Sequence, residues 1–88
     1  MIERDLVVKR AEGLHFRALV SIARIVSSQQ CRVVFEKHDG EKAAAGSLLE
    51  MLALCALQGT ILHATAEGVN AEKTIDLIGK IFDNGAGI

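Results

Sequence analysis

The residue types best suited to group-transfer chemistry stand together near the amino terminus, in the run Gly13-Leu14-His15-Phe16-Arg17. An imidazole nitrogen is a nucleophile, and a planar guanidinium pairs well with the oxygens of a phosphoryl group. His15 directly precedes an apolar periodicity typical of a helix, and the residues just before that helix include no Ser, Thr, Asp or Asn to cap it. We therefore expect the amides of Phe16 and Arg17 to be free to bind an anion, and His15 to carry a phosphoryl group.

A second polar position that could do chemistry is Ser47, which precedes another short apolar segment. Glu50 follows three residues later, and this spacing is the pattern of a capping box at a helix N-terminus. From the residues alone, Ser47 is therefore interpreted as a helix N-cap.

The elements that position these residues follow the order strand, helix, strand, strand, short helix, strand, helix. Apolar periodicity predicts strands over 3–9, 31–37, 41–44 and 60–65, and helices over 16–29, 48–53 and 71–82. The Asp39-Gly40 pair predicts a hairpin between the second and third strands. This order predicts an α+β, two-layer domain over residues 1–88, with one face of the sheet covered by helices. A ferredoxin-like arrangement also fits the pattern, so the strand order stays open.

Composition limits the classes of function. Half of the 88 residues are apolar, which is enough for a core. The net charge is -1 and the chain has neither Trp nor Tyr, so we expect no nucleic-acid binding. The first residues have no apolar signal-peptide core, and no apolar run reaches the roughly 20 residues of a membrane span. These features predict a cytoplasmic protein without membrane insertion.

The cysteines and the other histidines do not form a recognisable reactive site. Cys31 and Cys55 are interpreted as two buried free thiols. The histidines and cysteines lack metal-ligand spacing, so we expect no metal and no other cofactor. His38 is interpreted as a turn residue, and His63 as a strand residue with a local hydrogen-bond partner.

Four segments of the chain together resemble the family of the histidine-containing phosphocarrier protein HPr, of the bacterial phosphotransferase system. Gly13-Leu14-His15-x-Arg17 matches the active-site motif, and Gly46-Ser47-Leu48-Leu49 matches the regulatory-serine segment. Gln58-Gly59-Thr60 and Ala66-Glu67-Gly68 match two further landmarks in register. The resemblance covers nearly the whole chain. It implies an open-faced β-sandwich, with a four-stranded antiparallel sheet and three helices on one face.

The resemblance also implies a role for each motif. Enzyme I, charged by phosphoenolpyruvate, would phosphorylate Nδ1 of His15, and the group would pass to a IIA domain during sugar transport. Arg17 would contact the phosphate, and an HPr kinase/phosphorylase would phosphorylate Ser47. The protein would be a stoichiometric carrier and not an enzyme with turnover of its own.

Apolar residues near these motifs are expected to dock enzyme I and IIA domains. They are Phe16, Val20, Leu48, Leu49 and Leu52.

The small size and balanced charge favour a monomer. The chain departs from the family pattern at Ala18, where proline is usual, and at Phe16, where a small or polar residue is usual. Two alternatives stay open: a regulatory paralogue in nitrogen-related or catabolite control, and an interaction domain that carries no phosphate.

Overall fold

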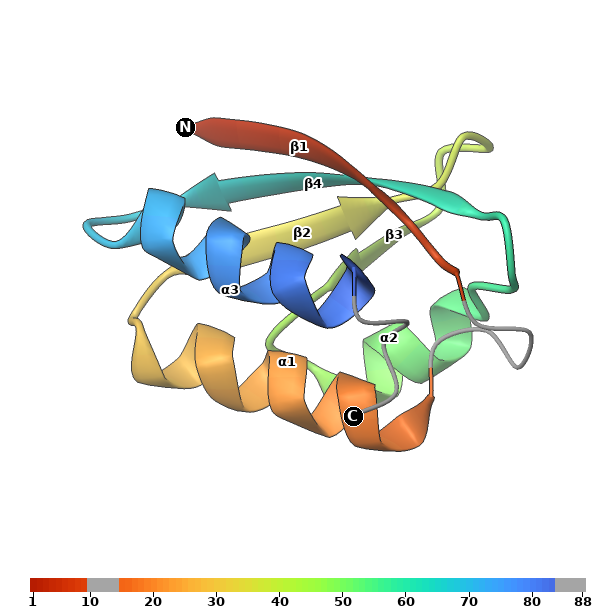
Figure 1. Cartoon of the computed structure of the whole chain (residues 1–88), viewed down its shortest axis with the longest axis horizontal. Coiled ribbons are helices and arrows are strands. Elements are labelled where there is room, and N and C mark those ends of the chain that lie inside the picture. The colour runs from red at the N-terminus through yellow and green to blue at the C-terminus, as the bar shows by residue number, and fades with distance from the viewer. Residues whose placement is uncertain (10–14, 84–88) are drawn as a thin grey trace.

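The computed structural model describes residues 1–9 and 15–83, and the strands of this part form one antiparallel sheet (Figure 1). The strands are β1 (Ile2–Val7), β2 (Arg32–Glu36), β3 (Lys42–Ala44) and β4 (Ile61–Glu67). The helices are α1 (Phe16–Ser28), α2 (Leu48–Leu54) and α3 (Ala71–Asp83). All three helices lie on the same side of the sheet, so the predicted open-faced sandwich is confirmed. Gly13 and Leu14 of the first motif lie outside the described residues.

The sheet has the strand order β1-β4-β2-β3, which decides the point that the sequence pattern leaves open. β4 lies between β1 and β2, and β3 pairs with β2 through the predicted hairpin. In the hairpin turn, the Asp39 carboxylate accepts a hydrogen bond of 2.9 Å from the Glu41 amide, and Gly40 has a φ of 92°. β1 and β3 are therefore the edge strands.

The faces of the sheet follow the two-residue period of β4. Leu62, Ala64 and Ala66 are buried against the helices, whereas Ile61 and His63 lie on the open face. The predicted strand limits differ from the observed ones, because β1 ends at Val7 and β4 extends to Glu67. Strand ends are poorly marked by periodicity, since flanking residues in extended loops keep the same alternation.

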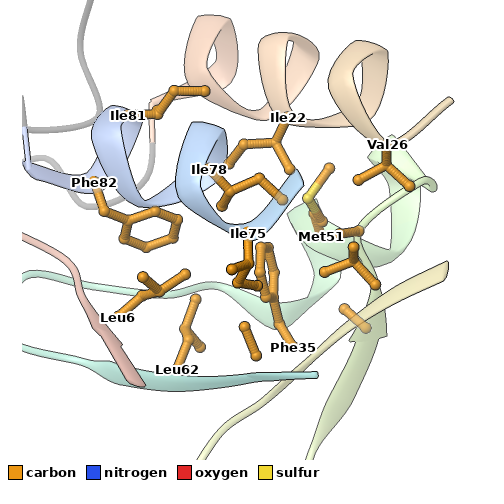
Figure 2. Close-up of a cluster of buried hydrophobic side chains, with 14 of the residues drawn as sticks. Leu6, Ile22, Val26, Phe35, Met51, Leu62, Ile75, Ile78, Ile81 and Phe82 are labelled. Atoms are coloured by element: carbon orange, nitrogen blue, oxygen red, sulfur yellow. The ribbon is translucent and has the colours of Figure 1, made fainter. Parts of the chain in front are cut away.

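The core fixes the helices against the sheet. In Figure 2, Ile22 of α1, Met51 of α2 and Ile78 of α3 point into a common apolar interior above the sheet. Phe35 of β2 meets Phe82 of α3 edge to face, with ring centroids 6.0 Å apart. Each such buried side chain contributes about 1.5–3 kcal/mol. α1 packs against both other helices, so its first turn is held at a defined place.

The two thiols are in different environments. Cys31 is buried as predicted, but the prediction of burial is wrong for Cys55, which is exposed. Cys55 is the C-cap residue of α2, with φ 55° and ψ 53°, so the helical periodicity that predicts burial ends there. Among the helices of residues 1–9 and 15–83, none combines the length and apolar character needed to cross a bilayer.

Candidate functional site

His15 occupies the N-cap position of α1. Its backbone is extended, with φ -72° and ψ 146°, and its carbonyl accepts the Leu19 amide at 3.1 Å. Its ring nitrogen Nδ1 accepts a hydrogen bond of 3.2 Å from the Arg17 amide. The side chain is exposed, so the ring lies at the surface and at the positive end of the helix dipole.

The prediction of a free Arg17 amide is therefore wrong, because the histidine itself takes the place of the missing cap. An imidazole nitrogen can accept such a bond only when it carries no proton, so the neutral ring holds its proton on Nε2. Nδ1 consequently presents its lone pair at the helix terminus. The sequence signal for this role was weak: His15 directly precedes the helical periodicity, but histidine is not among the preferred N-cap residues.

The electrostatic surroundings of Nδ1 favour an anion. The first turn of α1 contains no acidic residue, and Arg17 in that turn is exposed. Backbone amides at a helix N-terminus and a guanidinium both bind phosphate oxygens well. The arrangement can therefore support a negatively charged group attached to Nδ1.

The N-terminus of α2 is built differently. Ser47 is the N-cap, and its Oγ accepts the Glu50 amide at 3.2 Å, which confirms the predicted cap. The reciprocal half of the predicted capping box is wrong, because the Glu50 carboxylate accepts the Ala44 amide at 2.9 Å. β3 is an edge strand, so the Ala44 amide has no neighbouring strand to bond and takes the carboxylate as its acceptor.

The predicted docking residues come from two helices that contact each other, α1 and α2. Phe16 is 56% exposed, Leu49 79% and Leu52 44%. Val20 and Leu48 are half-buried, and Leu48 also packs against the core. Leu57, just beyond α2, is a further exposed apolar residue that is not among the predicted docking residues. Its exposure depends on the irregular exit of the chain from that helix, which periodicity does not describe.

Comparison with known proteins identifies the family. A family model described as the PTS HPr component phosphorylation site matches residues 2–84. The chain belongs to this family. The HPr family is that of the phosphocarrier of the phosphotransferase system, so the resemblance inferred from the four sequence motifs is confirmed.

Similar HPr-family proteins cover the chain almost completely. The phosphocarrier protein NPr of Proteus mirabilis is 30% identical over 82 residues, which are 93% of this chain and 91% of that protein. The multiphosphoryl transfer protein of Haemophilus influenzae is 32% identical over 98% of this chain, which corresponds to only 18% of that longer protein. Among solved structures, HPr-C-His from Thermoanaerobacter tengcongensis has a TM-score of 0.89 and 25% identity, and the match covers 100% of this chain and 98% of that one.

Proposed function

We propose that His15 accepts a phosphoryl group on Nδ1 from phosphorylated enzyme I and passes it to a IIA domain in sugar transport. The observation that carries this proposal is the bond from the Arg17 amide to Nδ1, at an exposed helix N-terminus without acidic residues. The same geometry supports Nδ1 as the nucleophilic atom and the Arg17 amide as a group that would next bind a phosphoryl oxygen.

In the proposed step, the Arg17 amide exchanges one hydrogen-bond acceptor, Nδ1 of His15, for another, a phosphoryl oxygen. The Nδ1 lone pair attacks phosphorus, and the bond from phosphorus to the donor breaks with its electron pair going to the donor. The proton stays on Nε2, so the ring is cationic beside the phosphoryl oxygens until solvent removes that proton. The Arg17 amide, released from Nδ1, donates to a phosphoryl oxygen, and the Phe16 amide lies next to it in the same turn.

Charge neutralisation is the main remaining task, since positioning and electrostatics dominate phosphoryl transfer. The Arg17 guanidinium supplies a fixed cation in the first turn of α1, and the helix dipole adds to it. Arg17 is exposed, so water competes for its contacts. A carrier needs such moderate binding, because the same group must leave on the next transfer.

Docking of enzyme I and IIA domains is proposed to use the exposed apolar surface of α1 and α2. This docking surface consists of Phe16, Val20, Leu48, Leu49 and Leu52. Apolar patches rimmed by polar groups are typical of transient protein contacts. In this proposal the 88-residue chain acts in the cytoplasm as a single-domain monomer, with no cofactor and no turnover of its own.

Ser47 is proposed as a regulatory phosphorylation site for an HPr kinase/phosphorylase. It lies beside Leu48 and Leu49, so a phosphate of about −2 charge would enter the docking surface and weaken association. The neighbouring Glu50 carboxylate would add to the repulsion. Incubation with such a kinase and mass spectrometry should place one phosphate on Ser47, and a chain left unmodified would contradict this role.

The similarity to NPr supports a second candidate, a regulatory paralogue in a nitrogen-related branch of the system. The two candidates share the chemistry of His15 and differ in the acceptor. Rates of transfer from phosphorylated chain to a sugar-specific IIA domain and to a nitrogen-related one, measured side by side, distinguish them. Preference for the nitrogen-related acceptor would replace the sugar-transport proposal.

Phosphoenolpyruvate-driven labelling with purified enzyme I tests the central proposal. The wild type should acquire one acid-labile phosphoryl group, His15→Ala should acquire none, and His38→Ala should behave as the wild type. His38 is a matched control because it is an exposed histidine in the β2–β3 hairpin. Undiminished label in His15→Ala, or an unlabelled wild type, would refute the proposal.

A further inference from the structure

The open face of the sheet carries a histidine held by two carboxylates. His63 lies in β4 directly opposite Asp5 of β1. Its Nδ1 is 2.8 Å from a carboxylate oxygen of Asp5, and its Nε2 is 2.8 Å from one of Glu3, also in β1. The His63 side chain thus connects β4 to β1, in addition to the backbone pairing between these two strands.

This geometry specifies a protonation state. An ionised carboxylate can only accept hydrogen bonds, and a neutral imidazole has only one N–H to donate. Both contacts are therefore hydrogen bonds only when the ring is an imidazolium. In agreement, the hydrogen bonds to Asp5 and then Glu3 raise the pKa of His63 above the ordinary value of a histidine.

The other charges around His63 do not replace that cation. Glu36 of β2 lies opposite His63 on its other side, and Lys42 of β3 lies opposite Glu36. Lys37 and His38 line a hollow with His63 and Glu36, but Lys37 already bonds Glu41 and the Leu54 carbonyl. Farther along the same face, the register places Arg32 opposite Glu67. Three carboxylates lie near His63, those of Glu3, Asp5 and Glu36. Deprotonation of His63 therefore removes a positive charge that compensates their negative charges.

β1 depends on such contacts because it is an edge strand that pairs only with β4 in the described sheet. On its helix-facing side, Arg4 pairs with Asp76 of α3 at 2.7 Å, and Lys9 beyond the strand pairs with Asp83 at 3.3 Å. Arginine, lysine and aspartate keep their charges across neutral pH, whereas histidine does not. The charges of the helix-facing pairs therefore stay constant over the pH range in which the His63 contacts change.

We propose that His63 acts as a pH-sensitive latch between edge strand β1 and β4. As an imidazolium it stabilises the pairing of the two strands, and when it is deprotonated β1 separates from β4 more readily. The latch goes beyond the phosphocarrier role and does not depend on it. Because the folded chain holds the proton more tightly, the stabilisation is complete in acid, below the pKa of histidine in the unfolded chain. It is lost as the pH rises through the higher pKa of the folded chain. Since these groups are exposed, added salt weakens the latch.

Amide hydrogen exchange tests the latch directly. Protection of the β1 amides, expressed relative to the α3 amides of the same sample, should fall roughly three- to tenfold between about pH 5.5 and about pH 8.5. His63→Gln retains a hydrogen-bonding side chain but cannot be protonated, so its ratio should be constant with pH. His38→Gln, the matched control, should follow the wild type. The same pH dependence in His63→Gln as in the wild type would overturn the proposal.

A measurement on the wild type keeps the test independent of any variant. Nitrogen NMR should find both nitrogens of His63 protonated at a pH where the histidines of the urea-unfolded chain keep only one ring proton. Titration of His63 at or below the midpoint of the unfolded chain's histidines would equally overturn the latch. Moderate salt should bring the folded and unfolded midpoints closer together.

Discussion

The N-termini of α1 and α2 are built on the same plan and differ in charge. Each begins with a side chain that accepts an amide of the first turn at 3.2 Å, His15 for the amide of Arg17 and Ser47 for that of Glu50. At α1 the first turn has no acidic residue. At α2 the first turn carries Glu50, whose carboxylate is bound to Ala44.

One local motif can therefore contribute to stability, as at α2, or to chemistry, as we propose for α1. At α2 a fixed carboxylate already complements the helix dipole, so the terminus is satisfied and supports the fold. At α1 the acceptor is itself a nucleophile, and the neighbouring charge is the cation of Arg17. An incoming phosphoryl group would supply the negative charge that α1 lacks.

The largest effect is expected from a variant that separates the two roles of residue 15, as N-cap of α1 and as nucleophile. His15→Asn keeps a good N-cap, so we expect the free energy of unfolding to stay within about 0.5 kcal/mol of the wild type. Transfer of label from enzyme I should nevertheless be lost completely, since an amide is no nucleophile. Urea unfolding and phosphoenolpyruvate-driven labelling measure the two quantities. Retained label, or a collapse of stability, would break the proposed division of roles.

Removing the cation should have the next largest effect. Arg17→Gln is expected to slow phosphoryl transfer about 10- to 100-fold, because one charge-assisted contact to the phosphoryl group is lost. Arg24→Gln is the matched control, since Arg24 is also exposed on α1 but about two turns farther from His15. Single-turnover transfer rates at saturating partner check this. Equal losses in the two variants would indicate that the overall charge of α1, and not a local contact of Arg17, affects the transfer step.

At α2 we expect an effect on stability. Ser47→Ala removes the acceptor of the Glu50 amide and should destabilise the fold by about 1 kcal/mol. Ser47→Asn should restore most of that loss, because asparagine is an equally good N-cap. Neither variant should change labelling of His15 at saturating enzyme I. A labelling defect in Ser47→Asn would show that α2 does more than support the site.

The starts of both helices show which features local sequence signals predict and which depend on the fold. Periodic apolar residues such as Ile75 and Ile78 predicted α3, and Ser47 predicted the start of α2, because both signals are local. The Ala44 amide that donates to the Glu50 carboxylate could not be predicted, since Ala44 becomes a neighbour of Glu50 only when β3 forms the edge of the sheet. The role of His15 as an N-cap was not predicted for another reason: histidine is a rare N-cap residue, and none of the preferred N-cap residues directly precedes α1. The pairing of His63 with Glu3 and Asp5 required the strand order, which the pattern left open.

The smallest predicted effect lies at the other end of α2, where Cys55 adopts a left-handed conformation. A side chain in that conformation meets steric resistance that glycine avoids, and glycine is the common residue at such helix ends. Cys55→Gly should therefore stabilise the fold by about 0.5 kcal/mol, the steric gain being reduced by the greater freedom of glycine in the unfolded chain. Because Cys55 is exposed, little packing is lost. Cys55→Ala retains Cβ and should leave the urea midpoint unchanged. If alanine stabilised as much as glycine, the thiol and not the backbone would be the source of the effect, and the strain assigned to this end of α2 would be absent.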